Sequence, residues 1–363
     1  MALAMAMGLE LTSWAPPSVQ ASIKAGKPCP AVGKQVIKGP WTFTCKVRKG
    51  KKVWVRTARP TWERVAGDIL ASSDKRGTPV PADAFKVLTS PSVSAAVAQS
   101  VADSVRWSYQ SWQALAPVPS GYPLVIVDGA SRDWYLAYSA QLGYDNCGAG
   151  WWERTESLPW FTWGAVCTVD DPSGVGSSYL VYRLGMGVTA IEDALALHES
   201  VHVAQGLLLS EAVFSRSSEC WLGEGMAELY TGALLKSRES EALVVDSTRN
   251  FRWRVIRALA ALEPGTSEVS DPAYWLDVIR RSEDRGSELC LQNSLGYSLG
   301  YLVSEKLVAD FGESDLLRWL GESRKLKDPD VAFLTVFGVA QDRWYETSAA
   351  PYVAKEASRI LAR

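Results

Sequence analysis

The stretch HESVH at positions 198–202 contains the only two histidines of the 363-residue chain. Side chains four residues apart on an α-helix lie one above the other on the same face, so the imidazoles of His198 and His202 can reach a single ion. The carboxylate of Glu199 lies about 100° around the helix axis and stands beside that ion. Two histidines and a glutamate in this spacing are typical of a zinc hydrolase site.

The same histidines also fit a purely structural role. Ile191, Leu195, His198 and His202 follow the spacing of an apolar helix face. The histidines could therefore be core residues whose hydrogen bonds are satisfied, with Glu199 on the solvated side of the helix. Residues further along the chain favour the metal site.

A second group of candidate residues lies at positions 221–230, which read WLGEGMAELY. A catalytic zinc ion needs three protein ligands and an open position, and the chain has no third histidine, so the third ligand is a carboxylate, a cysteinate or absent. Residues 203–223 are enough for one helix to end and a second helix to fold back across it. On that second helix Glu224 and Glu228 are one turn apart. This spacing lets Glu224 bind the metal while Glu228 accepts the outer N–H of a ligand histidine.

HExxH followed by WxxEGxA resembles the gluzincin metallopeptidases, in particular the peptidase-MA-like proteins and the related aminopeptidases. The resemblance covers about residues 120–320. It implies that His198, His202 and Glu224 bind one zinc ion per chain and that Glu199 is the general base of peptide-bond hydrolysis. It also implies an α+β fold, with a small mixed sheet and the HExxH helix in the first half of the domain and helices in the second half.

A further match is YSLG at positions 297–300, which resembles the Tyr-x-x-Gly of the aminopeptidase-like members. In those proteins the phenol stabilises the tetrahedral intermediate, so the resemblance implies this role for Tyr297. The pattern is short and common. Tyr297 or Tyr301 could instead simply cap an apolar helix.

Other reaction types lack the residues that they need. Both histidines belong to HExxH, so none remains as the base for a serine or cysteine nucleophile, and no phosphate-binding glycine loop is present. With 38 basic and 40 acidic residues the net charge is −2, which gives no electrostatic reason to expect nucleic-acid binding. Sixteen tryptophans could form platforms for carbohydrate, but without a repeat they are more typical of core and groove residues.

The chain has six cysteines and no CxxC pair, which favours disulfides and an oxidising compartment over a structural zinc site. The alternative is six reduced core cysteines in a cytosolic protein. We expect each cysteine to pair with its nearest neighbour in sequence. The predicted pairs are Cys29 with Cys45, Cys147 with Cys167, and Cys220 with Cys290.

The first 25 residues partly resemble an export signal. Residues 1–9 are apolar and Val19-Gln20-Ala21 fits a cleavage site, but no basic residue precedes the apolar run and Glu10 interrupts it. We expect residues 1–25 to be a leader or a signal remnant. No later apolar run reaches about 18 residues, so no membrane span is expected. The cysteines and the leader together predict a protein that is secreted or located at the cell surface.

The remaining sequence predicts three parts. Residues 26–57 predict short strands of a disulfide-linked β module, residues 58–81 a polar linker, and residues 82–363 the catalytic domain. The module resembles small two-cysteine modules of secreted proteins from high-GC Gram-positive bacteria, by which its role would be attachment, for example a cell-wall contact, or none. The periodicity of apolar residues predicts helices at 92–112, 131–142, 251–262, 297–311 and 315–319, and strands at 124–127 and 179–184. By the gluzincin resemblance, strand 179–184 lies at the edge of the cleft and pairs with extended substrate.

These patterns together predict a secreted zinc metallopeptidase that acts on peptides or proteins. The alternative from another class is a non-catalytic extracellular protein that keeps the metal helix as a scaffold and binds glycan or cell wall through its tryptophans. Glu199 favours the enzyme, because a scaffold needs no base whereas peptide hydrolysis does. Hydrolysis of an amide other than a peptide bond is a third possibility.

Overall fold

The computed structural model describes residues 24–38, 41–58, 60–142, 147–168, 178–209, 220–235, 251–262, 264–265, 267–283 and 295–361. Contacts within the chain divide it into two compact units, Met1–Pro60 and Thr61–Arg363. The predicted metal ligands all lie in the second unit.

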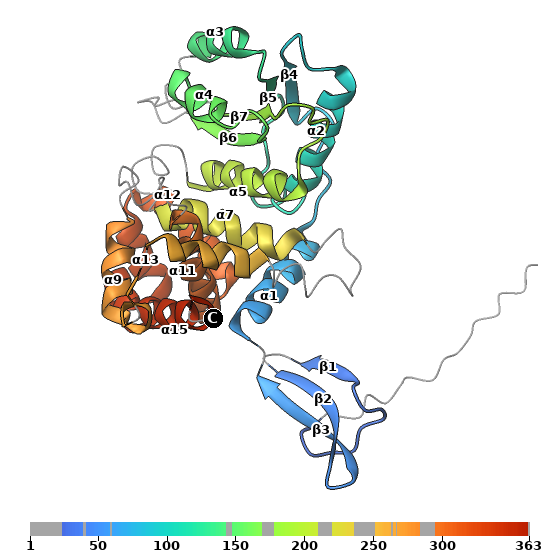
Figure 1. Cartoon of the computed structure of the whole chain (residues 1–363), viewed down its shortest axis with the longest axis vertical. Coiled ribbons are helices and arrows are strands. Elements are labelled where there is room, and N and C mark those ends of the chain that lie inside the picture. Colours follow the sequence, from blue (N-terminus) through green and yellow to red (C-terminus); the bar gives the residue numbers. More distant parts are fainter. Residues whose placement is uncertain are drawn as a thin grey trace, which may run out of the picture. The chain divides into compact units, whose positions relative to one another are not determined.

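The described part of the first unit is a three-stranded antiparallel sheet in the order β1-β2-β3 (Figure 1). The strands are β1 (Gln35–Lys38), β2 (Trp41–Arg48) and β3 (Lys51–Ala58). Lys49 and Gly50 both have positive φ, which the two-residue turn between twisted strands requires. A disulfide joins Cys29 to Cys45 in the small core of this unit, so the predicted β module and its cysteine pair are confirmed.

Helix α1 (Thr61–Arg76) opens the second unit and shows that the prediction of a linker at residues 58–81 is wrong. Three apolar side chains of α1 are buried: Val65, Ala66 and Ile69. The helix is further held by an ion pair of 2.8 Å between Arg76 and Glu313. The polar residues that indicated a linker form the solvated side of the helix, while its narrow apolar stripe packs against the unit.

A four-stranded mixed sheet lies in the second unit, in the order β4-β5-β7-β6. Its strands are β4 (Phe85–Thr89), β5 (Tyr122–Asp128), β6 (Trp163–Thr168) and β7 (Ser178–Leu184). Strands β4, β5 and β7 are parallel, and β6 runs antiparallel to β7. The predicted strands at 124–127 and 179–184 are confirmed, whereas the expectation that strand 179–184 pairs with an extended substrate is wrong, because both of its edges are paired within the sheet. Strand β7 is paired on both sides, and β6 forms the edge of the described sheet.

Both faces of this sheet are covered by helices, as Figure 1 shows with α3 and α4 on one side and α5 on the other. Besides α5, the helices that flank the sheet are α2 (Ala95–Tyr109), α3 (Arg132–Leu142) and α4 (Ala149–Glu156). Successive side chains of a strand point to opposite faces. Accordingly Leu180 and Tyr182 belong to the core shared with the large helical part, and Tyr179 and Val181 to the smaller core under α3 and α4. A disulfide between Cys147 and Cys167 ties the start of α4 to β6, as predicted.

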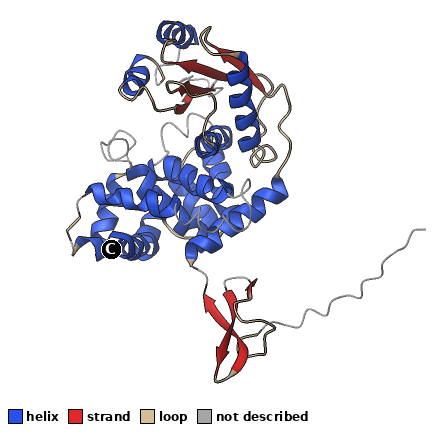
Figure 2. Cartoon of the chain, turned by 45° about the vertical axis from the view of Figure 1, so that its right-hand side comes forward, coloured by secondary structure: helices blue, strands red, loops and turns tan. Residues whose placement is uncertain are grey.

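The described elements after β7 are all helical, as Figure 2 shows. They are α5 (Asp193–Leu209), α7 (Cys220–Leu234), a helical stretch at 251–257 that continues into η2 (Ala258–Leu262), η3 (Glu268–Ser270), α9 (Pro272–Arg281), α11 (Leu295–Phe311), α12 (Glu313–Leu326), α13 (Pro329–Phe337), α14 (Gln341–Trp344), a π-helical turn η4 (Tyr345–Ala349) and α15 (Ala350–Leu361). The predicted helices at 251–262, 297–311 and 315–319 are confirmed. A mixed sheet followed by a helical half agrees with the predicted α+β class. In the described parts of the chain, no helix is long and apolar enough to cross a membrane.

Helix α7 lies between α5 and α11 and approaches α11 very closely. A Cβ atom on Gly225 of α7 would lie 2.0 Å from the carbonyl carbon of Gly300 in α11, and a Cβ on Gly300 would lie 2.6 Å from the carbonyl oxygen of Trp221. Only glycine allows two helix backbones to approach this closely. The contact fixes where α7 and α11 lie relative to each other, and both helices carry predicted site residues.

Candidate metal centre

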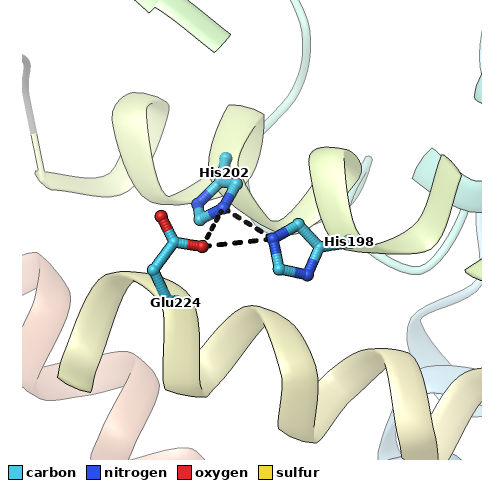
Figure 3. Close-up of side chains that lie close together, drawn as sticks. All are labelled: His198, His202 and Glu224. Carbon is cyan, nitrogen blue, oxygen red and sulfur yellow. Dashed lines mark hydrogen bonds and ion pairs between the residues drawn. The ribbon is translucent and has the colours of Figure 1, made fainter. Parts of the chain in front are cut away.

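His198, Glu199 and His202 lie on α5, which is buried along most of its length. The two imidazoles are almost completely buried and lie one helical turn apart, with ring centroids 4.8 Å from each other. Figure 3 shows the carboxylate of Glu224, which projects from the neighbouring helix α7, facing both rings. Helix α7 begins at Cys220, so Glu224 lies one turn inside the helix and not at its start.

Three donor atoms of these side chains form a nearly equilateral triangle. The Nε2 atoms of His198 and His202 are 3.1 Å apart, and each lies 3.2 Å from Oε2 of Glu224. In a tetrahedral zinc site with bonds of about 2.0–2.1 Å, neighbouring ligand atoms are about 3.3 Å apart. The triangle therefore has the size of one face of such a tetrahedron, and the opposite vertex is the position that a catalytic site keeps open.

The other ring nitrogen of each histidine faces an acceptor. Gln205 donates its amide N–H groups to the carbonyl oxygens of Leu222 and Gly223, which leaves its Oε1 to accept from Nδ1 of His202 at 2.9 Å. Nδ1 of His198 lies 3.4 Å from a carboxylate oxygen of Glu228. An acceptor at Nδ1 selects the tautomer with its proton there, so that Nε2 of each ring presents a lone pair to the triangle.

The charges of the cluster favour a cation within it. Burial raises the pKa of Glu224, but the charge of His202 and hydrogen bonds with both histidines outweigh burial and hold that pKa well below its ordinary value. Burial lowers the pKa of His198, yet hydrogen bonds with Glu224 and Glu228 outweigh it and raise the pKa well above the usual range. The Glu224 carboxylate therefore stays ionised beside the buried imidazoles, where it stabilises positive charge.

Glu199 is buried and stands apart from the triangle. Its Oε2 has no hydrogen-bond partner within the described part of the chain. Burial raises the pKa of this carboxyl group, with the charge of Glu224 acting in the same direction and the two histidines acting against it. The side chain lies against β6, where a Cβ atom on Gly164 would come within 2.6 Å of Cγ of Glu199. The missing side chain of Gly164 is thus what makes room for Glu199.

Tyr297, near the start of α11, completes the cluster. Its ring stacks on His198 with centroids 5.7 Å apart and planes inclined by 21°. The charge of Glu224 and burial raise the pKa of the phenol well above its ordinary value, and Tyr297 also hydrogen-bonds with Glu224. The phenol therefore keeps its proton and can donate it in a hydrogen bond. Tyr301, one turn further along, is instead buried in the hydrophobic core.

The structure brings together six residues that the sequence singled out. They are His198, Glu199, His202, Glu224, Glu228 and Tyr297. The predicted pair of Cys220 and Cys290 cannot be placed in the same way, because Cys290 and the side chain of Cys220 lie outside the described residues, so this pair stays a prediction.

Two contributors were not predicted, namely Gln205 and Gly164. Gln205 stands three residues after His202 and therefore on the same side of the helix, so the helical spacing did contain a signal for it. The sequence contained no such signal for Gly164. It lies on β6, a strand that the sequence did not predict, and it meets Glu199 only through the packing of β6 on α5.

The centre thus combines a triangle of metal donors, a buried carboxylate with an unpartnered oxygen, and a protonated phenol. These are the groups needed to hold a divalent cation, to move a proton and to stabilise a negatively charged oxygen. Comparison of the chain with protein-family models, with curated proteins and with solved structures finds no match. Because no relative indicates the chemistry of the centre, it is inferred from the residues of the centre alone.

Proposed function

We propose that the protein is a zinc-dependent metallopeptidase. The observation that carries this proposal is the triangle of two imidazole nitrogens and one carboxylate oxygen, with sides of 3.1 to 3.2 Å, beside the buried carboxylate of Glu199. Two neutral imidazoles and one carboxylate are a donor set that suits zinc and leaves a position open for chemistry.

His198, His202 and Glu224 would hold a zinc ion, which when bound would supply a water of lowered pKa and a Lewis acid for a carbonyl oxygen. Glu199 takes the proton of the attacking water and passes it to the leaving amine. A pKa raised by burial suits this role, because the carboxyl group must hold the proton between the two steps. Tyr297 donates a hydrogen bond to the oxygen on which negative charge develops.

The edge strand β6 suits an extended peptide as substrate. Gly164 brings the backbone of β6 against Glu199, so a peptide that pairs with the outer edge of β6 passes beside the general base. The two disulfides suit an oxidising compartment, and we infer that the protein is secreted or held at the cell surface.

The proposal is tested on the purified full-length chain by elemental analysis and by cleavage of a mixed peptide library with and without a chelator. We expect one zinc per chain and cleavage that the chelator abolishes. His202→Ala should lose the zinc, whereas Glu199→Gln should keep it and lose at least about 10²-fold in turnover, because Glu199 is a base and not a ligand. Glu192→Gln is the matched control, since Glu192 is exposed just before α5.

Three outcomes contradict the proposal in different ways. Absence of stoichiometric metal contradicts the metal site itself. Loss of zinc in Glu199→Gln moves Glu199 into the ligand set. Stoichiometric zinc without any peptide cleavage favours the non-catalytic extracellular binding protein.

A further inference from the structure

A second pocket, of about 800 Å³, lies at the carboxyl ends of the parallel strands β4, β5 and β7. It is lined by the ends of β5 and β7 and the segments that follow the three strands, by the start of α2, and by Glu156 and Pro159. In sheets with parallel strands, ligands bind at this end, where the loops diverge. The described residues of the metal centre are not part of its lining.

None of the described residues that line the pocket belongs to the metal centre, so the two sites are distinct. Tyr182 belongs to the core on the α5 side, and its pKa is raised by burial and then by the charge of Glu199. The next residue, Arg183, points to the other side, where its guanidinium lies 5.2 Å from the centre of the Trp152 ring. Arg183 lines the pocket, so the pocket is separate from the site proposed for hydrolysis.

One wall of the pocket is a network of hydroxyl groups around Asp128. Ser92 donates to Oδ1 of Asp128 at 2.8 Å, and Ser131 donates to the same oxygen at 2.5 Å. The backbone N–H of Ala130 also donates to it, at 3.1 Å. These bonds fix the direction of the carboxylate and of the Ser92 hydroxyl, both of which line the pocket.

Arg183, on the strand paired with the one that carries Asp128, is the other polar part of the lining and is only 2% exposed. Its Nη1 donates to the carbonyl oxygen of Thr155 at 2.8 Å, while its Nε has no partner among the described residues. Burial lowers the pKa of Arg183, and the carboxylates of Glu156 and Asp128 act in the opposite direction. Arg183 is therefore already balanced by two carboxylates. It therefore offers no free positive charge to a phosphate.

An exposed apolar rim adjoins this pocket. Met186 lines the pocket and is 73% exposed, and its backbone N–H donates to the carbonyl oxygen of Pro159, which also lines it. Trp160 and Phe161 follow directly and are 64% and 51% exposed. Large aromatic side chains that remain in water beside a polar pocket indicate a partner with flat apolar faces.

We propose that this pocket binds a neutral oligosaccharide. A sugar ring carries vicinal hydroxyl groups that both donate and accept, which matches the fixed carboxylate, serine hydroxyl and guanidinium that line the pocket. It also carries C–H faces, which match the apolar rim at Trp160 and Met186. A site of this volume holds one or two rings and leaves the rest of the chain to lie across the rim.

The test is isothermal titration of the full-length chain with four probes, namely the tetramers of N-acetylglucosamine, glucose in β-1,4 linkage, glucose in α-1,4 linkage and mannose. We expect saturable binding of at least one probe. Gly129→Leu should weaken that binding at least about tenfold, because its side chain projects into the pocket beside Arg183. Gly129 has no positive φ, so the substitution causes no backbone strain, and Gly150→Leu on α4 is the matched control.

A second variant tests the rim. Trp160→Ala should weaken binding by roughly two- to tenfold, whereas Trp253→Ala, which removes an exposed tryptophan of the helical half, should leave it unchanged. Melting temperature, zinc content and peptide cleavage should stay at wild-type values in all four variants. A negative binding result therefore contradicts the oligosaccharide proposal and leaves the metallopeptidase proposal standing. The inference is overturned if no probe binds at up to about 10 mM. It is equally overturned if folded Gly129→Leu and Trp160→Ala both bind with wild-type affinity.

Discussion

At the scale of single residues, two different acceptors face the outer nitrogens of the two histidines of the candidate metal centre. A carboxylate, Glu228, faces Nδ1 of His198, and a neutral amide, Gln205, faces Nδ1 of His202. Gln205 is itself held by two carbonyl oxygens at the start of α7. This amide therefore links the histidine on α5 to the helix that carries Glu224.

Removing the amide should weaken metal binding without removing a ligand. We expect Gln205→Ala to lower zinc affinity by about 10- to 100-fold, because the ring of His202 loses the acceptor that fixes its tautomer and direction. Competition with a chromogenic chelator measures the affinity. Gln99→Ala, at an exposed position of α2, is the control. Unchanged affinity in folded Gln205→Ala would show that helix packing alone orients the ring.

The phenol of Tyr297 should act only when negative charge develops on the substrate oxygen. Tyr297→Phe keeps the ring that stacks on His198, so zinc content and KM should change little while kcat falls by roughly 10²- to 10³-fold. Tyr301→Phe, one turn further along α11 in the core, should change kcat little. Steady-state kinetics on a peptide that the wild type cleaves distinguish the two. Full kcat in Tyr297→Phe would assign the phenol a structural role.

At the scale of elements, the contact between two glycines positions the centre. Gly225 follows Glu224 directly on α7, and Gly300 lies one turn after Tyr297 on α11. Their backbones touch, so the metal ligand and the phenol are carried by two helices at the closest distance that helices allow. The close packing of the two helices therefore explains why glycine stands at position 225, after Glu224, and at position 300, at the end of the YSLG match.

A methyl group at this contact should force the helices apart. We expect Gly300→Ala to lower the free energy of unfolding by about 1–3 kcal/mol and to reduce peptide hydrolysis as Tyr297 moves away from Glu224. Gly321→Ala on α12 is the matched control, because a Cβ there meets nothing within 4 Å. It should raise stability by about 0.5–1 kcal/mol, as alanine favours a helix over glycine. Chemical denaturation measures the free energy of unfolding of both variants. An unchanged value in Gly300→Ala would mean that α7 and α11 can move apart without loss of stability.

At the scale of the whole molecule, the chain is two compact units with separate cores. The first unit has a core of few residues, and its disulfide closes a span of 16 residues. Small sheets bury too little apolar surface to be stable without such help. The second unit holds the candidate metal centre and the large core.

The two units should therefore respond separately to loss of the first disulfide. Cys29→Ser combined with Cys45→Ser should destabilise the first unit by about 3 kcal/mol, while zinc content and peptide cleavage stay at wild-type values. Differential scanning calorimetry with parallel metal analysis checks both. The control is Cys147→Ser with Cys167→Ser, which should lower the melting temperature of the second unit. Loss of zinc in the first double variant would show that the units depend on each other.

The sequence by itself determined the features that depend on neighbouring residues. Two histidines four apart on a helix must share a face, so their pairing followed from helical geometry alone. The apolar runs at 124–127 and 179–184 predicted strands β5 and β7 for a similarly local reason, since a fully buried strand needs a continuous apolar stretch. Cysteines close in sequence formed the two described disulfides, because short spans are closed at the lowest entropic cost.

Only the tertiary structure decided how distant segments meet. Strand order follows from pairing across the sheet, so the edge position of β6 was not contained in any local pattern. Helix α1 has a narrow apolar stripe in a polar stretch, and it is stabilised by packing and by Glu313, far along the chain. Likewise Gly164 lies against Glu199, and Gly225 against Gly300, only because separate elements pack there. Local geometry could place the histidines on one face, but the third donor reached them only once α7 had packed on α5.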